Sequence, residues 1–182
     1  MTDALAASDA PVIDCSEGIE LLPAIGHEDH DHDTEYDPHI WMNEEAAEVM
    51  MNNILHGLGE LDGDNLDRYT ENFNAAAALL PGDDGRMSGL SCPYLITFHD
   101  GFQYFARDNG LTILKAIEEE EGSEASAAEI KEIVALIQEY DIPAIFTEVN
   151  GSDATAQAIA RETGVRVYQL DMIMSGEGVG MQ

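Results

Sequence analysis

Short apolar runs alternate with amphipathic segments throughout the second half of the chain. Apolar runs of strand length occupy residues 94–98, 111–116, 143–147 and 165–170. Between them, apolar residues recur at helical spacing in residues 101–109, 126–137 and 152–163. Short runs rich in β-branched residues and bounded by turn residues are typical of buried parallel strands. The pattern therefore predicts an α/β fold with a parallel, doubly wound sheet whose strands are connected by helices.

The first half of the chain is predicted to be mainly helical, after a short strand at residues 12–14. Asn43 can cap a helix whose apolar residues follow at helical spacing. This helix is expected to end at three glycines, Gly57, Gly59 and Gly63. A second helical pattern covers residues 64–80 and stops at a Pro-Gly pair. The polar residues 82–90 are the best candidate for a linker.

A histidine and two carboxylates follow three of the predicted strands. His99 comes after the first strand, Glu148 after the third and Asp171 after the fourth. Parallel strands present their carboxyl ends to one edge of the sheet, where open α/β folds bind their ligands. We expect the three side chains to gather there, with His99 and Asp171 as nitrogen and oxygen donors for zinc. A lone histidine more commonly satisfies a local hydrogen bond, and Glu148 alone fits a supporting carboxylate.

A histidine-rich segment precedes the predicted helices. Four of the six histidines alternate there with carboxylates and without apolar periodicity: His27, His30, His32 and His39. Imidazole and carboxylate groups together suit zinc and neighbouring metals. The first three histidines fit equally well an exposed polar loop that binds metal only adventitiously. His39 differs because it lies between Pro38 and an apolar Ile-Trp pair, so packing should hold it as a third ligand from outside the sheet.

The chain is strongly acidic, with 7 Lys and Arg against 37 Asp and Glu and a formal charge of -30 at pH 7. Such a charge repels nucleic acid and anionic lipid, so neither is expected as a partner, whereas divalent cations are attracted. A solvated acidic surface without a specific ligand has the same composition. Neither a membrane-spanning run nor a targeting signal is expected in these 182 residues. Cys15 and Cys92 lack the spacing of a metal or redox motif.

Five separated motifs resemble those of the solute-binding proteins of zinc and manganese ABC importers. They lie at residues 37–41, 97–105, 123–127, 145–148 and 170–171. The resemblance implies two α/β lobes, joined by a long helix, that clasp one divalent ion. It implies His39 as the ligand from the first lobe, and His99 and Asp171 as the ligands from the second. A histidine at position 99, where manganese binders often have glutamate, favours Zn²⁺ over Mn²⁺.

The resemblance also implies a division of the chain. Residues 1–63 would form a partial amino-terminal lobe with the histidine-rich loop, 64–90 a connecting helix and linker, and 91–182 the carboxyl-terminal metal-binding lobe. The family's first strands, which carry another metal-ligating histidine, and its closing helices are not recognised here, so we expect a form truncated at both ends. His27, His30 or His32 could replace the missing ligand. Glu148 would support the site from behind the ligands.

The resemblance implies a function in transport without catalysis. The full-length parent would lie outside the cytoplasm, in the periplasm or as a cell-surface lipoprotein, and deliver zinc to a membrane permease. Coordination needs neutral imidazole, so affinity should weaken as the pH falls through about 6.5, the value of an unperturbed ring.

Two alternatives use the same residues. A metal-dependent hydrolase would keep a water-filled position on the ion, although the chain has no Gly-x-Ser-x-Gly, His-Glu-x-x-His or phosphate-binding motif. A fragment without the first strands would leave a sheet edge or apolar face exposed, which favours self-association.

Overall fold

The computed structural model describes residues 10–24, 36–80, 82, 87, 89–117, 125–148 and 153–171. Contacts divide the chain into a helical unit, Met1–Glu20 with Asn43–Asp84, and a sheet unit, Leu21–Met42 with Gly85–Gln182. The predicted division placed residues 21–42 with the first helices, whereas their contacts lie within the sheet unit. The assignment of family lobes to 1–63, 64–90 and 91–182 stays a prediction.

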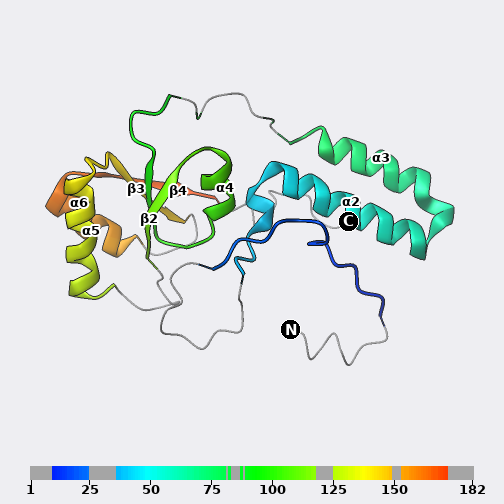
Figure 1. Cartoon of the computed structure of the whole chain (residues 1–182), viewed down its shortest axis with the longest axis horizontal. Coiled ribbons are helices and arrows are strands. Elements are labelled where there is room, and N and C mark those ends of the chain that lie inside the picture. Colours follow the sequence, from blue (N-terminus) through cyan, green and yellow to red (C-terminus); the bar gives the residue numbers. More distant parts are fainter. Residues whose placement is uncertain are drawn as a thin grey trace. The chain divides into compact units, whose positions relative to one another are not determined.

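The sheet unit is built on four parallel strands in the order β2-β1-β3-β4. The strands are β1 (Tyr94–Thr97), β2 (Thr112–Ala116), β3 (Ala144–Glu148) and β4 (Arg166–Leu170). The helices that connect them are α4 (Gln103–Asp108), α5 (Ala127–Glu139) and α6 (Ala154–Thr163). In Figure 1, α5 and α6 lie on one side of the sheet and α4 on the other. The predicted parallel α/β sheet is confirmed, with each strand end within one residue of its expected position.

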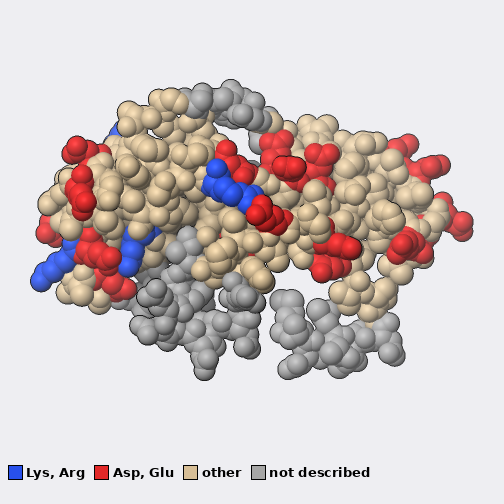
Figure 2. Space-filling view, in the orientation of Figure 1, with Lys and Arg blue, Asp and Glu red and all other residues tan. Residues whose placement is uncertain are grey.

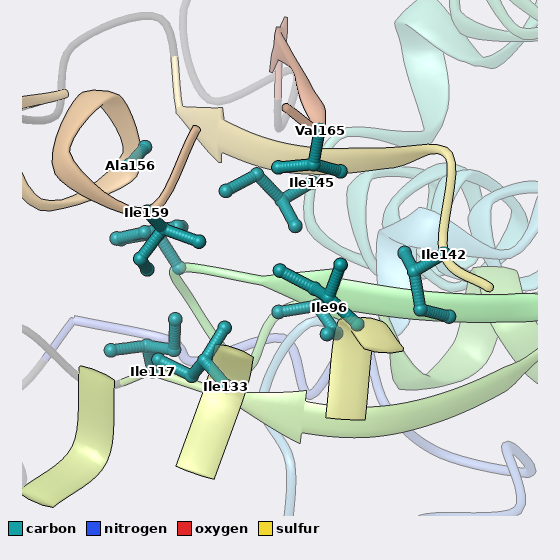
Figure 3. Close-up of a cluster of buried hydrophobic side chains, with 10 residues drawn as sticks. Ile96, Ile117, Ile133, Ile142, Ile145, Ala156, Ile159 and Val165 are labelled. Atoms are coloured by element: carbon teal, nitrogen blue, oxygen red, sulfur yellow. The ribbon is translucent and has the colours of Figure 1, made fainter. Parts of the chain in front are cut away.

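Isoleucines from both strands and helices form the core of the sheet unit (Figure 3). Ile96 of β1 and Ile145 of β3 belong to one buried cluster with Ile133 of α5 and Ile159 of α6. All four side chains are fully buried. Burying one such side chain contributes about 1.5–3 kcal/mol. This core therefore holds α5 and α6 on one face of the sheet and fixes the register of its central strands.

The helical unit contains two helices joined by a short turn: α2 (Glu44–Leu61), the 3-10 turn η2 (Gly63–Asn65) and α3 (Leu66–Ala77). Asn43 caps α2 as predicted, because its side chain accepts a hydrogen bond from the amide of Ala46. Tyr69 of α3 donates a 2.7 Å hydrogen bond to the carboxylate of Asp62. This bond lowers the pKa of Asp62 and raises the pKa of Tyr69.

Two predictions for the helical unit are wrong. Residues 12–14 form no strand; Asp14 instead accepts hydrogen bonds from the amide and hydroxyl of Ser16, at 2.9 and 2.7 Å. Helix α2 passes through Gly57 and Gly59 and ends only at Leu61. A Cβ atom at Gly57 would lie 2.5 Å from Cδ1 of Ile13. Glycine at 57 therefore permits close packing of a remote segment on the helix and does not end it.

Acidic side chains dominate the charged surface. Figure 2 shows many Asp and Glu residues and few Lys and Arg residues on the face drawn. Basic side chains are engaged at Arg107, 3.1 Å from Asp108, and at Lys115, 3.1 Å from Glu132. Across the described ranges, no helix combines the length and apolar character needed to span a bilayer.

We expect the folded state to gain stability as salt is added. A net charge of -30 opposes compaction through self-repulsion, and the Debye length falls from about 30 Å at 0.01 M salt to about 3 Å at 1 M. The thermal midpoint of the metal-free protein should therefore rise between these two salt concentrations. Sucrose at matched osmolality controls for solvent exclusion, and a midpoint that is flat or falls with salt contradicts the expectation.

The start of α5 provides a pH-dependent test of the fold. Ser126 accepts from the amide of Glu129 at 3.2 Å, and the Glu129 carboxylate accepts from the amide of Ser126 at 2.7 Å. The hydrogen bonds from Ser126 lower the pKa of Glu129 below 4.5. Its charged form therefore stabilises the fold at pH values above 4.5, and this contribution is lost as the pH falls through the lowered pKa.

Glu129→Gln should accordingly unfold more easily than the parent at pH 7, and the difference should shrink at an acidic pH below 4.5. Urea denaturation at both pH values measures it, and comparing variant with parent cancels the effect of the other carboxylates. Ser126→Ala should cost about 1 kcal/mol at pH 7 by removing the cap. An equal difference between Glu129→Gln and parent at both pH values contradicts this account.

Candidate metal centre

His99 lies two residues past the end of β1, in the turn before α4. Thr97, fully buried at the end of the strand, donates a 2.8 Å hydrogen bond from its hydroxyl to the carbonyl oxygen of His99. The amide of Phe98 donates at 3.0 Å to the carbonyl of Phe146 on β3. The backbone on which His99 stands is thus tied both to its own strand and to the neighbouring one. Its imidazole remains 43% exposed.

His39 lies just before the 3-10 turn η1 (Ile40–Met42), in a segment that belongs to the sheet unit. Asp37 holds it twice: Oδ1 accepts from the His39 amide at 2.9 Å and lies 2.6 Å from ring atom Nδ1. The Trp41 ring contacts the imidazole edge-on, with 5.4 Å between centroids. The His39 side chain is 11% exposed. The sequence-based expectation that packing holds His39 agrees with this environment.

The two imidazoles face each other through the same ring atom. Nε2 of His39 lies 3.1 Å from Nε2 of His99, with the ring planes at 87°. On the far side, Nδ1 of His99 lies 3.4 Å from Oε1 of Glu148 at the end of β3. That separation brings the carboxylate of Glu148 beside the ring, although Oε1 forms no hydrogen bond with any described residue. Each imidazole therefore has a carboxylate at Nδ1 and its partner's Nε2 in front.

This arrangement can accept a cation between the two rings. A carboxylate only accepts, so the bond to Asp37 assigns the proton of His39 to Nδ1 and leaves a lone pair on Nε2. With its proton on Nε2, His99 donates to Nε2 of His39; with its proton on the Nδ1 that faces Glu148, it presents a second lone pair to the same point. Two Zn–N bonds of about 2.0–2.1 Å at the tetrahedral angle hold their nitrogens about 3.3 Å apart. The observed 3.1 Å matches that span.

Two buried carboxylates beside these histidines were missed by the sequence analysis. Asp37 and Asp100 are 1% and 7% exposed. Among the described residues, Asp37, His39 and Asp100 each offer a ligand atom within 4.8 Å of the others. Their position in the chain is the sequence feature that could have identified them. Asp37 precedes His39 by two residues, and Asp100 directly follows His99.

The remaining predicted site residues are not grouped with these histidines among the described residues. Asp171 directly follows β4 and is exposed. In the described part of the chain, no group of three ligand atoms within 4.8 Å of one another includes it. His27, His30 and His32 lie outside the described residues. The structure thus brings together His39, His99 and Glu148, while Asp171 and the three loop histidines stay predictions as ligands.

Tyr104 of α4 lies beneath the His39 segment with its ring fully buried. Its hydroxyl accepts from the amide of Leu22 at 2.9 Å and donates to the carbonyl of Asp37 at 3.1 Å. Burial raises the pKa of Tyr104 above its usual value of 10.0. The hydroxyl therefore keeps its proton at neutral pH and can act as the donor to Asp37.

The fold and the facing imidazoles define an α/β protein with a candidate metal centre at the carboxyl edge of its sheet. The model of a protein family, ZnuA, described as zinc-uptake complex component A, periplasmic, matches residues 1–180. The chain belongs to this family. The predicted membership of the zinc-type solute-binding proteins is thereby confirmed.

Relatives and solved structures agree with the family assignment. The zinc-binding lipoprotein AdcA of Streptococcus pneumoniae is 27% identical over 186 residues, which cover 96% of this chain and 37% of AdcA. A zinc-bound deletion mutant of ZnuA has a TM-score of 0.74 and 32% identity, covering 94% of this chain and 65% of that one. FpvC of Pseudomonas aeruginosa in complex with Mn²⁺ has a TM-score of 0.76 and 27% identity, covering 96% and 66%.

The chain is shorter than the proteins it matches. It covers 53% and 37% of the first two curated relatives, and 62% of the first solved chain. The activities, substrates and partners of the whole relatives are therefore only proposed for this chain.

Proposed function

We propose that this chain binds one Zn²⁺ ion as the solute-binding component of a metal ABC importer. The 3.1 Å approach of the Nε2 atoms of His39 and His99 carries the proposal, together with the carboxylates at both Nδ1 atoms. Without a cation, a proton on Nε2 of His99 makes this contact a hydrogen bond to Nε2 of His39. With a cation between them, the same geometry supplies half of a tetrahedral site.

Further ligands complete the proposed coordination. Asp171 is the proposed carboxylate ligand, because it leaves β4 at the sheet edge where His99 leaves β1. Glu148 would act behind His99 by orienting its ring, as outer carboxylates do for metal-bound histidines. His27, His30 and His32 are auxiliary candidates, one of which would fill the fourth position.

The donor set favours zinc over manganese. Imidazole nitrogens suit zinc, whereas manganese prefers sites dominated by oxygen. The relatives include proteins named for zinc and one solved with Mn²⁺, so the choice for this chain depends on its own two imidazoles. A site with His39, His99 and one carboxylate contains two nitrogens and one oxygen, which is a zinc-type composition.

The proposed role is capture and delivery without catalysis. A membrane permease would receive the ion, and the protein would work outside the cytoplasm, as the periplasmic family description and the lipoprotein relative suggest. The acidic surface would raise the local concentration of divalent cations near the site. Neither hydrolysis nor self-association is favoured by a particular feature of the described residues.

Removing either imidazole should weaken zinc binding strongly. A structural zinc site contributes about 10–16 kcal/mol over four ligands, so one ligand is worth about 3 kcal/mol, or on the order of 100-fold in affinity. His39→Ala and His99→Ala should each show this loss in competition titrations with a chromogenic chelator. His56→Ala is the matched control, because His56 is exposed on α2 and lies 3.8 Å from Glu60. Equal affinities in all four proteins would refute the proposed site.

The loop histidines and Asp171 can be separated by a second set of variants. Asp171→Asn should lower zinc affinity on the order of 100-fold if the carboxylate is a ligand. The triple replacement of His27, His30 and His32 by Ala should lower it by a similar factor if one of them fills the fourth position. A triple variant with parental affinity would remove the loop histidines from the coordination shell and leave His39 and His99 as its nitrogen donors.

A further inference from the structure

Hydrogen bonds to Tyr104 hold the segment that carries His39 within the sheet unit. Tyr104 of α4 links two segments of the chain. Its hydroxyl accepts a hydrogen bond from the Leu22 amide and donates one to the Asp37 carbonyl. The amide of Asp37 also donates to the carbonyl of Leu22 at 2.8 Å. Pro23 and Tyr36 form an isolated antiparallel bridge beside this pair. Tyr104 thus fixes the backbone from which the Asp37 side chain reaches His39.

The carboxylate of Asp37 is buried in a position that disfavours folding. It is 1% exposed, and no described residue forms a hydrogen bond with its Oδ2. A charged oxygen removed from water and left without a hydrogen bond opposes folding. Asp100, another acid, contributes an atom within 4.8 Å of the same group, which adds like charge to this pocket. A local turn does not require that charge, because a neutral asparagine accepts an amide hydrogen bond equally well.

The charge becomes useful when His39 binds a cation. A carboxylate on Nδ1 holds the imidazole in one tautomer, orients the ring and raises the basicity of Nε2. We propose that Asp37 and Tyr104 are positioning residues for the metal ligand His39, with Asp37 acting through the Nδ1 hydrogen bond and Tyr104 through the Asp37 backbone. This inference rests on the proposed function, in which His39 binds zinc. Neither side chain needs to touch the ion.

The tautomer of His39 provides a test that requires no metal. Long-range ¹H–¹⁵N spectra of the metal-free chain should show the His39 proton on Nδ1 alone. In Asp37→Asn the amide can offer Nδ1 either an oxygen or an NH₂ group, so we expect both tautomers to be populated. A parental spectrum with the proton on Nε2, or an Asp37→Asn spectrum identical to the parent, would overturn the role of Asp37.

Measurements of zinc affinity test the positioning roles of Asp37 and Tyr104 together. Losing an outer partner of a metal-bound histidine typically lowers affinity 10- to 100-fold, so we expect about that loss for Asp37→Asn and about 10-fold for Tyr104→Phe. The helical unit offers a control pair, because the Tyr69 hydroxyl there also donates to an aspartate, although to the side-chain carboxylate of Asp62 and not to a backbone carbonyl. Asp62→Asn and Tyr69→Phe make the same two chemical changes within the helical unit and should keep parental affinity.

The outcomes separate this inference from the proposed function. If the parent binds zinc and His39→Ala does not, while Asp37→Asn and Tyr104→Phe bind as the parent does, the positioning role is wrong and the metal site stands. If the controls lose as much affinity as the test variants, the effect is general destabilisation and the positioning role is again wrong. A parent that does not bind zinc removes the proposed function, whereas the tautomer spectra still decide whether Asp37 sets the His39 ring.

Discussion

The parallel pairing of β1 with β3 and of β3 with β4 is the constraint on which the candidate metal centre depends. Thr97 pairs with Phe146, and Glu148 pairs with Leu170, so the residues that follow these strands leave the sheet at one edge. The isoleucine core keeps this register, because a slip of one residue would turn Ile145 away from α5 and α6. An entirely apolar cluster thus sets the position of His99 and Glu148.

His39 is held at the same point by different contacts. It belongs to no strand, and its place depends on polar contacts to Asp37 and, through the Asp37 carbonyl, to Tyr104. Tyr104 sits on α4, the helix that begins a few residues after His99. One short stretch of chain after β1 therefore supplies one imidazole directly and supports the backbone behind the other. The strand register and the hydrogen bonds of Thr97 and Phe98 position His99. Hydrogen bonds of Asp37 and Tyr104 position His39.

Local patterns were sufficient to predict the sheet unit and much of the site. The four strands are short apolar runs bounded by turn residues, so their ends could be placed within one residue. His99 and Glu148 followed from the rule that strand ends meet at one edge. The role of the Tyr104 hydroxyl could not be found in this way, because its contacts join residues 82 and 67 positions apart. Gly57 was misread for the same reason, since its role depends on Ile13. Asp37 was missed although it lies only two residues before His39.

The hydrogen bond between the Asp37 amide and the Leu22 carbonyl has a consequence for how such proteins change over time. It brings together the two ends of a histidine-rich interval, and lengthening a closed loop costs only about 0.6 kcal/mol per doubling. Insertions, deletions and changes of composition between those ends can accumulate while the imidazole beyond them keeps its place. The position of His39 is therefore independent of the number of residues in that interval.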